Sequence, residues 1–361
     1  MSDRHYNFNA GPSTLPLPVL ERAQAEFLNF EDSGMSLIEH SHRGAVYEAV
    51  HNETIALLRE ILAVPDSHEI LFMAGGASTQ FALVPMNLRR DDHAGDYIVT
   101  GTWAKKALDE AKVIGDPHVA WNGESDGKWE RVPKADELDL TDDAPYLHLT
   151  TNNTIMGTQF FEMPQSSAPL ILDMSSDILW RPMDWSNIGM VYAGAQKNMG
   201  PSGITVVIIR KDLIEQGRTD LPKIFRYATV AKANSLQNTI ATFPVYMVRN
   251  VLQWVKEQGG TEAMERHNRA KAELLYGAVD SSNGYYHCPV ERESRSVMNP
   301  VFRLKDPALD KKFIAEAAEA GLVGLKGHRS VGGVRASMYN AMTQRGVQAL
   351  VDFMGRFKSA N

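Results

Sequence analysis

The chain has few of the features that mark secreted, membrane-spanning or disulfide-linked proteins. Cys288 is the only cysteine among 361 residues, so an intrachain disulfide is impossible and a reducing compartment fits. No apolar run is long enough to span a bilayer, and the first residues lack the apolar core of a signal peptide. We therefore expect a cytoplasmic protein.

Positive charge is also in short supply. Lysine and arginine number 37 against 44 aspartate and glutamate residues, and the net charge of -7 argues against nucleic acid or an anionic membrane surface as a partner. An anionic substrate would need local cations that overcome this field. The composition, 43% hydrophobic and 22% charged, is typical of a globular protein, and the length suffices for two domains.

Short apolar segments alternate with helix-like segments through most of the chain. We predict strands at 69–73, 97–100, 146–150, 170–173, 190–192 and 204–209, and helices at 44–63, from 76 to about 88, and after Trp103. This alternation predicts an α/β fold with a mainly parallel sheet covered by helices on both faces.

The last third of the chain predicts a smaller α/β domain. A long helical stretch from Phe243 to about Tyr276 would lead into it, and we expect strands at 297–305 and 332–338 and helices at 307–320 and 343–357. We divide the chain into an N-terminal arm (1–15), a large domain (16–262) and a small C-terminal domain (263–361).

Asp173 and Lys197 are the most informative pair. Asp173 ends an apolar strand, and Lys197 follows the next one within a segment of small residues. Pyridoxal phosphate (PLP) needs a lysine that forms a Schiff base with its aldehyde and a carboxylate that keeps its pyridine nitrogen protonated. Taken singly, Asp173 could be a helix N-cap and Lys197 a solvated surface lysine.

Other polar groups also follow predicted strands directly. Ligands of open α/β sheets gather at the carboxyl ends of the strands, so these groups would converge with Asp173 and Lys197. Gly75-Gly-Ala-Ser-Thr79 could cradle a phosphate or form an ordinary turn. Trp103 could stack on a ring or pack in the core. Thr154 could bond a ring oxygen or cap a loop.

Two clusters of basic residues remain, His40-Ser-His42-Arg43-Gly44 and the segment from Lys326 to Arg335. Arginine forks bind carboxylate and phosphate through two parallel bonds, so the clusters indicate a substrate with two anionic groups. The alternative is surface charge with structural histidines. No carboxylate or cysteine accompanies them at ligand spacing, so we do not expect a metal site.

Together these motifs make the chain resemble the phosphoserine aminotransferase family of class V, fold-type-I PLP-dependent enzymes. The resemblance runs nearly end to end. It rests on Phe8-Asn-Ala-Gly-Pro12, Ser41-His-Arg-Gly44, Gly75-Gly-Ala-Ser-Thr-Gln-Phe81, Asp173-Met-Ser-Ser176, Ala193-Gly-Ala-Gln-Lys-Asn198, Asn238-Thr239, Gly327-His-Arg329 and Gly332-Gly-Val-Arg335.

The resemblance also implies roles for single residues. Lys197 and Asp173 would be catalytic, as the Schiff-base lysine and the partner of the pyridinium nitrogen. The cofactor would be held by Ala77, Ser78, Trp103, Thr154, Asp173, Gln196 and Lys197, and by Asn238 and Thr239 of the partner subunit in a homodimer. Substrate would be bound by His42, Arg43, His328, Arg329 and Arg335. Ser78 stands where some relatives carry arginine, so no side-chain cation is expected there.

The activity that the resemblance implies is reversible transamination in serine biosynthesis. L-Glutamate and 3-phosphohydroxypyruvate would give 2-oxoglutarate and O-phospho-L-serine, and the family suggests a parallel role on 4-phosphohydroxythreonine in pyridoxine biosynthesis. One alternative is a class V transaminase of the serine–glyoxylate type, whose substrate would not need the two His-Arg pairs. Another is a non-catalytic phosphometabolite-binding protein, which would not need Lys197. A cysteine desulfurase is disfavoured because Cys288 lies away from the strand ends.

Overall fold

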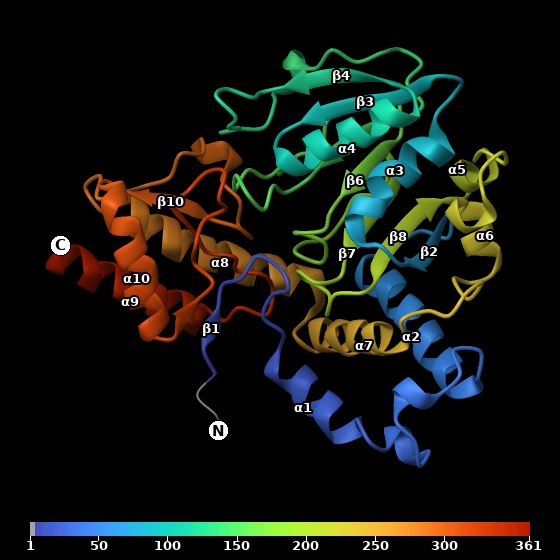
Figure 1. Ribbon diagram of the computed structural model, residues 1–361, viewed down its shortest axis with the longest axis horizontal. Helices are drawn as coiled ribbons and strands as arrows, with labels where there is room; N and C mark the ends of the chain where they lie inside the picture. Colours follow the sequence, from blue (N-terminus) through green and yellow to red (C-terminus); the bar gives the residue numbers. More distant parts are fainter. Residues whose placement is uncertain (1–3) are drawn as a thin grey trace.

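A seven-stranded sheet forms the centre of the computed structural model, which describes residues 4–361 (Figure 1). Its strands, in spatial order, are β2 (His68–Met73), β8 (Thr205–Arg210), β7 (Ile188–Gly194), β6 (Leu170–Asp173), β5 (Leu147–Thr150), β3 (His93–Val99) and β4 (Asp116–Asn122). β8 is antiparallel to both of its neighbours, and every other pairing is parallel. The prediction of an α/β fold with a mainly parallel sheet is confirmed.

Helices cover both faces of this sheet (Figure 1). Successive residues of β2 show the alternation: Ile70 and Phe72 pack in one core cluster, and Leu71 and Met73 pack in another. The first cluster contains α2 (Ala45–Ile61) and α7 (Thr242–Glu257), and the second contains α3 (Gly76–Leu88), α4 (Thr102–Ile114), α5 (Lys211–Glu215) and α6 (Tyr227–Lys232). Burial on both faces explains why the central strands read as continuous apolar runs.

Two sequence-based expectations for this part of the chain were wrong. Strand β4 was missed because it is an edge strand, bonded only to β3, and its partly exposed sequence Asp-Pro-His-Val-Ala-Trp-Asn lacks a clear apolar pattern. The helical stretch predicted from Phe243 to Tyr276 is two helices, α7 and α8 (Gly260–Asp280). Gln258 and Gly259 separate them, and Gly259 and Gly260, the first residue of α8, have φ values of 99° and 73°, a left-handed conformation that glycine adopts readily.

The C-terminal part has its own small antiparallel sheet, with order β12 (Val334–Arg335), β10 (Val301–Leu304) and β9 (Tyr286–His287). Helices α8, α9 (Asp310–Glu319) and α10 (Gln344–Ala360) pack around it in a separate core cluster. β10 is shorter than the predicted strand 297–305, because Pro300 has no N–H for a ladder and the amides of Met298 and Asn299 bond the Ser296 hydroxyl. β12 is likewise shorter than predicted.

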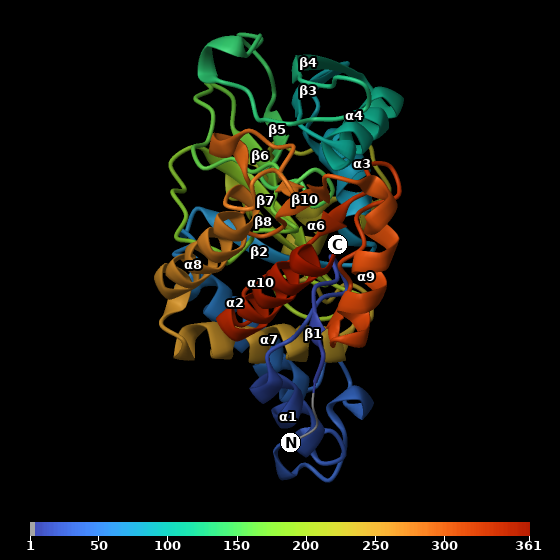
Figure 2. The same ribbon diagram turned by 90° about the vertical axis from the view of Figure 1, so that its left-hand side faces the viewer.

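The N-terminal arm belongs to this second core. β1 (Tyr6–Asn7) pairs in parallel with β11 (Leu322–Val323), and Phe8 is completely buried in the C-terminal cluster. Figure 2 shows the dark-blue arm running beside α9 and α10 before the chain continues to α1 (Leu17–Glu26). The division into residues 16–262 and 263–361 stays a prediction. None of the described helices combines the length and apolar character needed to cross a membrane.

We expect Phe8→Ala to destabilise the protein, because Phe8 is 0% exposed and its removal leaves a cavity between the arm and the C-terminal core. The free energy of unfolding should fall by about 4 kcal/mol in urea denaturation. Val113→Ala is the control, since Val113 is 79% exposed and should change the stability by less than about 0.5 kcal/mol. Equal losses for the two variants would show that the arm is not part of the folded core.

Candidate active site

The strand ends of the large sheet place several polar side chains at one edge. Asp173 is the last residue of β6, and Lys197 lies in the connection from β7 to β8. Because β8 runs back antiparallel, this connection stays at the carboxyl end of β7. Thr154 follows β5, and Trp103 lies in the first turn of α4. The convergence of strand ends that the sequence predicted is therefore present.

The amine of Lys197 is in contact with two of these groups. Its Nζ donates a hydrogen bond of 2.6 Å to Thr154 Oγ1 and lies 5.7 Å from the centre of the Trp103 ring. Burial lowers the pKa of Lys197 from 10.5 to about 8; the Asp173 carboxylate opposes this change and the Arg335 charge adds to it. Roughly a tenth of this amine is therefore neutral, and nucleophilic, at pH 7, far more than for a lysine with a pKa of 10.5.

The Asp173 carboxylate is buried and only partly satisfied by the protein. Its Oδ1 accepts hydrogen bonds from the Ser175 amide, at 3.0 Å, and from the Ser175 hydroxyl, at 2.6 Å. No hydrogen bond to Oδ2 is found among the described residues. Burial raises the pKa of Asp173, while Ser175 and the charge of Lys197 oppose the rise. The free oxygen can therefore accept a bond from a cationic donor.

Arg335 brings a cation to the same place. Its Nη1 donates to the carbonyl oxygen of Thr154 at 3.3 Å, and its buried Nε has no hydrogen-bond partner among the described residues. A buried donor without a partner is rare in a folded protein and points to a ligand that supplies the acceptor. Arg335, Arg329 and Lys106 all contribute to lowering the pKa of His328, after burial, so positive charge gathers around that imidazole.

The N-terminus of α3 faces this edge without a side-chain cap. Gly75 and Gly76 precede Ala77 and Ser78 with φ values of 90° and 68°, and a Cβ at Gly75 would collide with Thr79. The glycines are thus required for this tight turn, which leaves the first N–H groups of the helix free. Free amides at a helix N-terminus bind anions.

The comparison with known proteins decides the family. A family model described as aminotransferase class-V matches residues 5–350. Curated phosphoserine aminotransferases of Niallia circulans and Bacillus subtilis (strain 168) are 55% and 48% identical over 99% of both chains. The solved phosphoserine aminotransferase of Bacillus circulans subsp. alkalophilus has a TM-score of 0.97 at 54% identity and 99% coverage of both chains.

This chain belongs to the phosphoserine aminotransferase family. The PLP-bound member from Trichomonas vaginalis superposes with a TM-score of 0.92 at 42% identity, with 98% of this chain and 100% of the other covered. The chain is therefore a PLP-dependent aminotransferase of fold type I. Its sheet edge fits the cofactor in three respects: the low pKa of Lys197, the free oxygen of Asp173 and the uncapped N-terminus of α3.

The structure does not bring all of the expected site residues together. No described contact joins His42 or Arg43, which precede α2, to Lys197, although His42 Nε2 is buried without a partner. Asn238 and Thr239 are exposed between α6 and α7, and Asn238 bonds only the Thr239 carbonyl oxygen. No group of three His, Cys, Asp or Glu side chains within residues 4–361 is arranged to bind a metal ion.

Sequence reasoning missed the residues that hold the lysine segment in place. The Ser13 amide donates to the Gln196 carbonyl oxygen at 3.0 Å, and the Ser13 hydroxyl donates to that of Lys197. The Asn340 amide donates to Asn198 Oδ1 at 2.9 Å. The only local signals were sequence positions: Ser13 directly follows the Phe8–Pro12 motif, and Asn198 directly follows Lys197 in the lysine motif.

We expect the uptake of PLP by the apoprotein to follow the unusual pKa of Lys197. With a pKa of about 8, roughly a tenth of the amine is neutral at pH 7 and about half at pH 8, so the rate should rise roughly fivefold and level off above about pH 9. The measurement is the cofactor absorption against time, divided at each pH by the rate for Nα-acetyl-lysine with free PLP. If the pKa were near 10.5, this ratio would stay constant across the range.

Proposed function

We propose that the enzyme transfers the amino group of L-glutamate to 3-phosphohydroxypyruvate, reversibly, giving 2-oxoglutarate and O-phospho-L-serine in serine biosynthesis. The observation that carries this proposal is the buried Nε of Arg335, which has no partner in the described part of the chain and belongs to a guanidinium whose charge acts on Lys197. An amino acid whose carboxylate is bound by Arg335 would have its Cα close to the Lys197 amine, which can act as a base. We infer the identity of the phosphorylated substrate from the relatives, which are phosphoserine aminotransferases.

When bound, the cofactor supplies an electron-accepting ring that stabilises the negative charge left on the substrate Cα after proton removal. Lys197 Nζ would take that proton from the substrate Cα and deliver it to the second reacting carbon. A pKa of about 8 suits an amine that must both accept and release a proton. The Asp173 carboxylate, with Oδ1 fixed by Ser175, would keep a proton on the ring nitrogen through Oδ2. Both residues thus act by holding or moving one proton.

The remaining cofactor contacts are proposed from position. The amides of Ala77 and Ser78 at the start of α3 would hold the phosphate, with Gln196 nearby. The Trp103 ring would lie on the cofactor ring, and the Thr154 hydroxyl, now bonded to Lys197, would bond the ring oxygen. These groups orient the cofactor and exclude water from the reacting atoms.

Two anionic groups must be bound at once. We propose that Arg335 binds the substrate α-carboxylate and that His328 and Arg329, together with His42 and Arg43, bind the distal carboxylate or phosphate. The gathering of cations around His328 supports this assignment, because it opposes the net charge of -7. A substrate with an uncharged distal end would leave these cations without a counter-ion, which disfavours the serine–glyoxylate type.

We further propose a homodimer in which Asn238 and Thr239 reach the cofactor phosphate of the partner. Both residues are exposed, and among residues 4–361 no hydrogen bond joins either side chain to Lys197 or Asp173. The segment that leads to His42 and Arg43 carries exposed apolar side chains. They are Phe27, Leu28, Met35 and Ile38, with exposed fractions of 43%, 81%, 40% and 50%. An apolar surface of this kind is typical of an interface.

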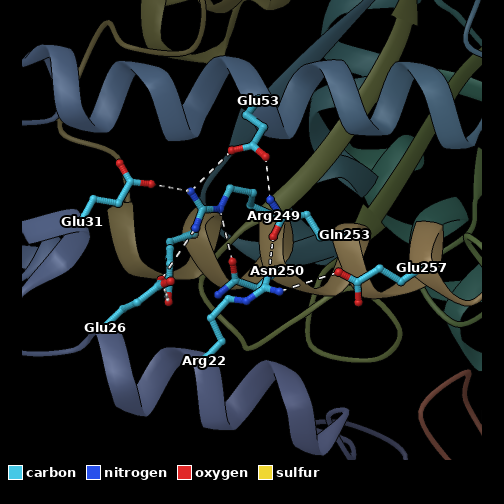
Figure 3. Close-up of polar contacts among 9 residues, drawn as sticks. Arg22, Glu26, Glu31, Glu53, Arg249, Asn250, Gln253 and Glu257 are labelled. Carbon is cyan, nitrogen blue, oxygen red and sulfur yellow. Dashed lines mark hydrogen bonds and ion pairs between the residues drawn. The ribbon is translucent and has the colours of Figure 1, made fainter.

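A charge network holds this segment in place on its own protomer. Figure 3 shows Arg249 of α7 between Glu26 of α1, Glu53 of α2 and Glu31. The guanidinium nitrogens lie 3.8, 3.4 and 3.6 Å, respectively, from the carboxylate oxygens of these residues. The Arg249 guanidinium also lies 5.5 Å from the centre of the buried Phe30 ring. All of these contacts lie within one protomer, so they can hold the apolar surface in place for a second subunit to pack against.

We also propose a cellular location and a second substrate for the enzyme. A cytoplasmic enzyme agrees with the single cysteine of the chain. 4-Phosphohydroxythreonine carries an amino group, a carboxylate and a phosphate, so the pocket proposed for phosphoserine would accept it as well. We propose that the enzyme also acts in pyridoxine biosynthesis on this compound.

The proposed function is tested by the visible absorption of the holoenzyme during titration with O-phospho-L-serine and, separately, with L-serine. We expect phosphoserine to abolish the cofactor band at concentrations about 100-fold lower than L-serine does. Two or more charge-assisted hydrogen bonds to its phosphate would each contribute roughly 1.5–3 kcal/mol, and desolvation of the phosphate would offset part of this gain. An equal response to both amino acids would assign the enzyme to a transaminase of unphosphorylated substrates.

The shared site is tested by mixing Lys197→Ala protein with Asn238→Ala protein. In a mixed dimer, the Lys197 of one subunit would meet the Asn238 of the other, which restores one complete site. We expect each parent to be weak or inactive and the mixture to recover activity in proportion to the mixed dimers, verified by mass spectrometry. Mixed dimers without recovery would place Asn238 in the site of its own subunit.

A further inference from the structure

Lys271 of α8 is a buried cation without an acidic partner among the described residues. It is 1% exposed, and its Nζ donates to three backbone carbonyl oxygens, those of Met338, Tyr339 and Met342, at 2.9, 2.8 and 3.0 Å. All three belong to the turn 338–342 that follows β12. The ammonium group is therefore surrounded by one turn of chain.

The number of donors matches the number of acceptors. A lysine ammonium carries three N–H groups, and each finds one carbonyl oxygen here. Burial lowers the pKa of Lys271 from 10.5 to about 7, whereas the hydrogen bonds that Nζ donates to three carbonyl oxygens favour the charged form. An apolar residue at this position would avoid that burial cost but would leave the carbonyl oxygens of the turn without these donors.

The turn that Lys271 holds is joined directly to the active site. The Asn340 amide donates to Asn198 Oδ1, next to Lys197, and Asn340 Nδ2 donates to the Leu179 carbonyl oxygen at 3.0 Å. The Tyr339 hydroxyl donates to the Ala10 carbonyl oxygen at 2.7 Å. Arg335 lies three residues before the turn. The turn that Lys271 bonds is thus hydrogen-bonded to the lysine segment and follows the strand that carries Arg335.

We propose that Lys271 is a positioning residue for transamination, an internal cation that fixes the turn 338–342 and through it the places of Lys197 and Arg335. This role rests on the proposed function of the site. Without the ammonium group, the three carbonyl oxygens lose their donors and the turn relaxes. Asn340 then no longer holds Asn198, and Arg335 loses its fixed distance from the Lys197 amine.

The test compares Lys271→Ala and Lys271→Met holoenzymes with the wild type for kcat, for the KM of glutamate and for thermal unfolding. We expect the KM of glutamate to rise about tenfold and kcat to fall in both variants. A change of about tenfold is the size expected when a charge-assisted hydrogen bond is lost. Added n-propylammonium should restore Lys271→Ala, because it supplies the three missing carbons and the ammonium group.

Three controls separate this role from plain stabilisation. Lys271→Met fills the cavity and should not respond to n-propylammonium, and n-propanol should restore neither variant. Lower melting temperatures with wild-type kcat and KM would overturn the proposal. Wild-type enzyme that does not transaminate glutamate would overturn the proposed function as well.

A variant at Asn198 keeps the test decisive even where the Lys271 variants do not fold. Asn198→Ala removes the acceptor of the Asn340 amide and the donor to the Ile178 carbonyl oxygen, but it leaves the Lys271 contacts intact. We expect the same rise in KM and fall in kcat, with a lower melting temperature because the buried bond to the Ile178 carbonyl oxygen is lost as well. Unchanged kinetics in this variant would show that the turn does not act on Lys197.

Discussion

The burial of an ammonium group and a carboxyl group at one edge of the sheet is the constraint on which the rest of the site depends. Loss of water lowers the pKa of Lys197 to about 8 and raises that of Asp173. Each group also stabilises the charge of the other, so neither shift becomes complete. The outcome is an amine that can exchange a proton near neutral pH beside a carboxylate that can hold one. An aminotransferase needs both properties in the same place.

This arrangement is a consequence of strand order and direction. The sequence alone predicted the strand that ends at Asp173 and the strand that precedes Lys197. Both are buried on both faces, and such strands are nearly continuous in apolar residues. The positions of Thr154 and Trp103 followed from the rule that strand ends converge. The reversal at β8 was not readable, since an apolar run has the same pattern in either direction. It nevertheless decides that Lys197 stays at the reactive edge.

Contacts between distant parts of the chain were beyond the sequence for a different reason. Ser13 and the carbonyl oxygen of Lys197 are 184 residues apart, and Asn340 and Asn198 are 142 apart. Hydrogen bonds of this kind leave no periodic signal, because a serine or asparagine in a loop has many local explanations. The edge strand β4 and the break at Gly259 were missed for the opposite reason, since their local signals were weak or ambiguous. The sequence thus predicted which side chains lie at the carboxyl edge of the sheet better than it predicted the residues that hold them in place.

The support of the lysine segment also links the two cores of the protein. Ser13 reaches it from the N-terminal arm, whose Phe8 is buried in the C-terminal core, and Asn340 reaches it from a turn fixed by α8. Asn198 Nδ2 in turn donates to the Ile178 carbonyl oxygen, just beyond Asp173. Any displacement of the C-terminal core would therefore act on the Lys197 segment and on the chain after Asp173 together. The distance between the Lys197 amine and the buried Asp173 carboxylate therefore depends on the packing of both cores as well as on the sheet.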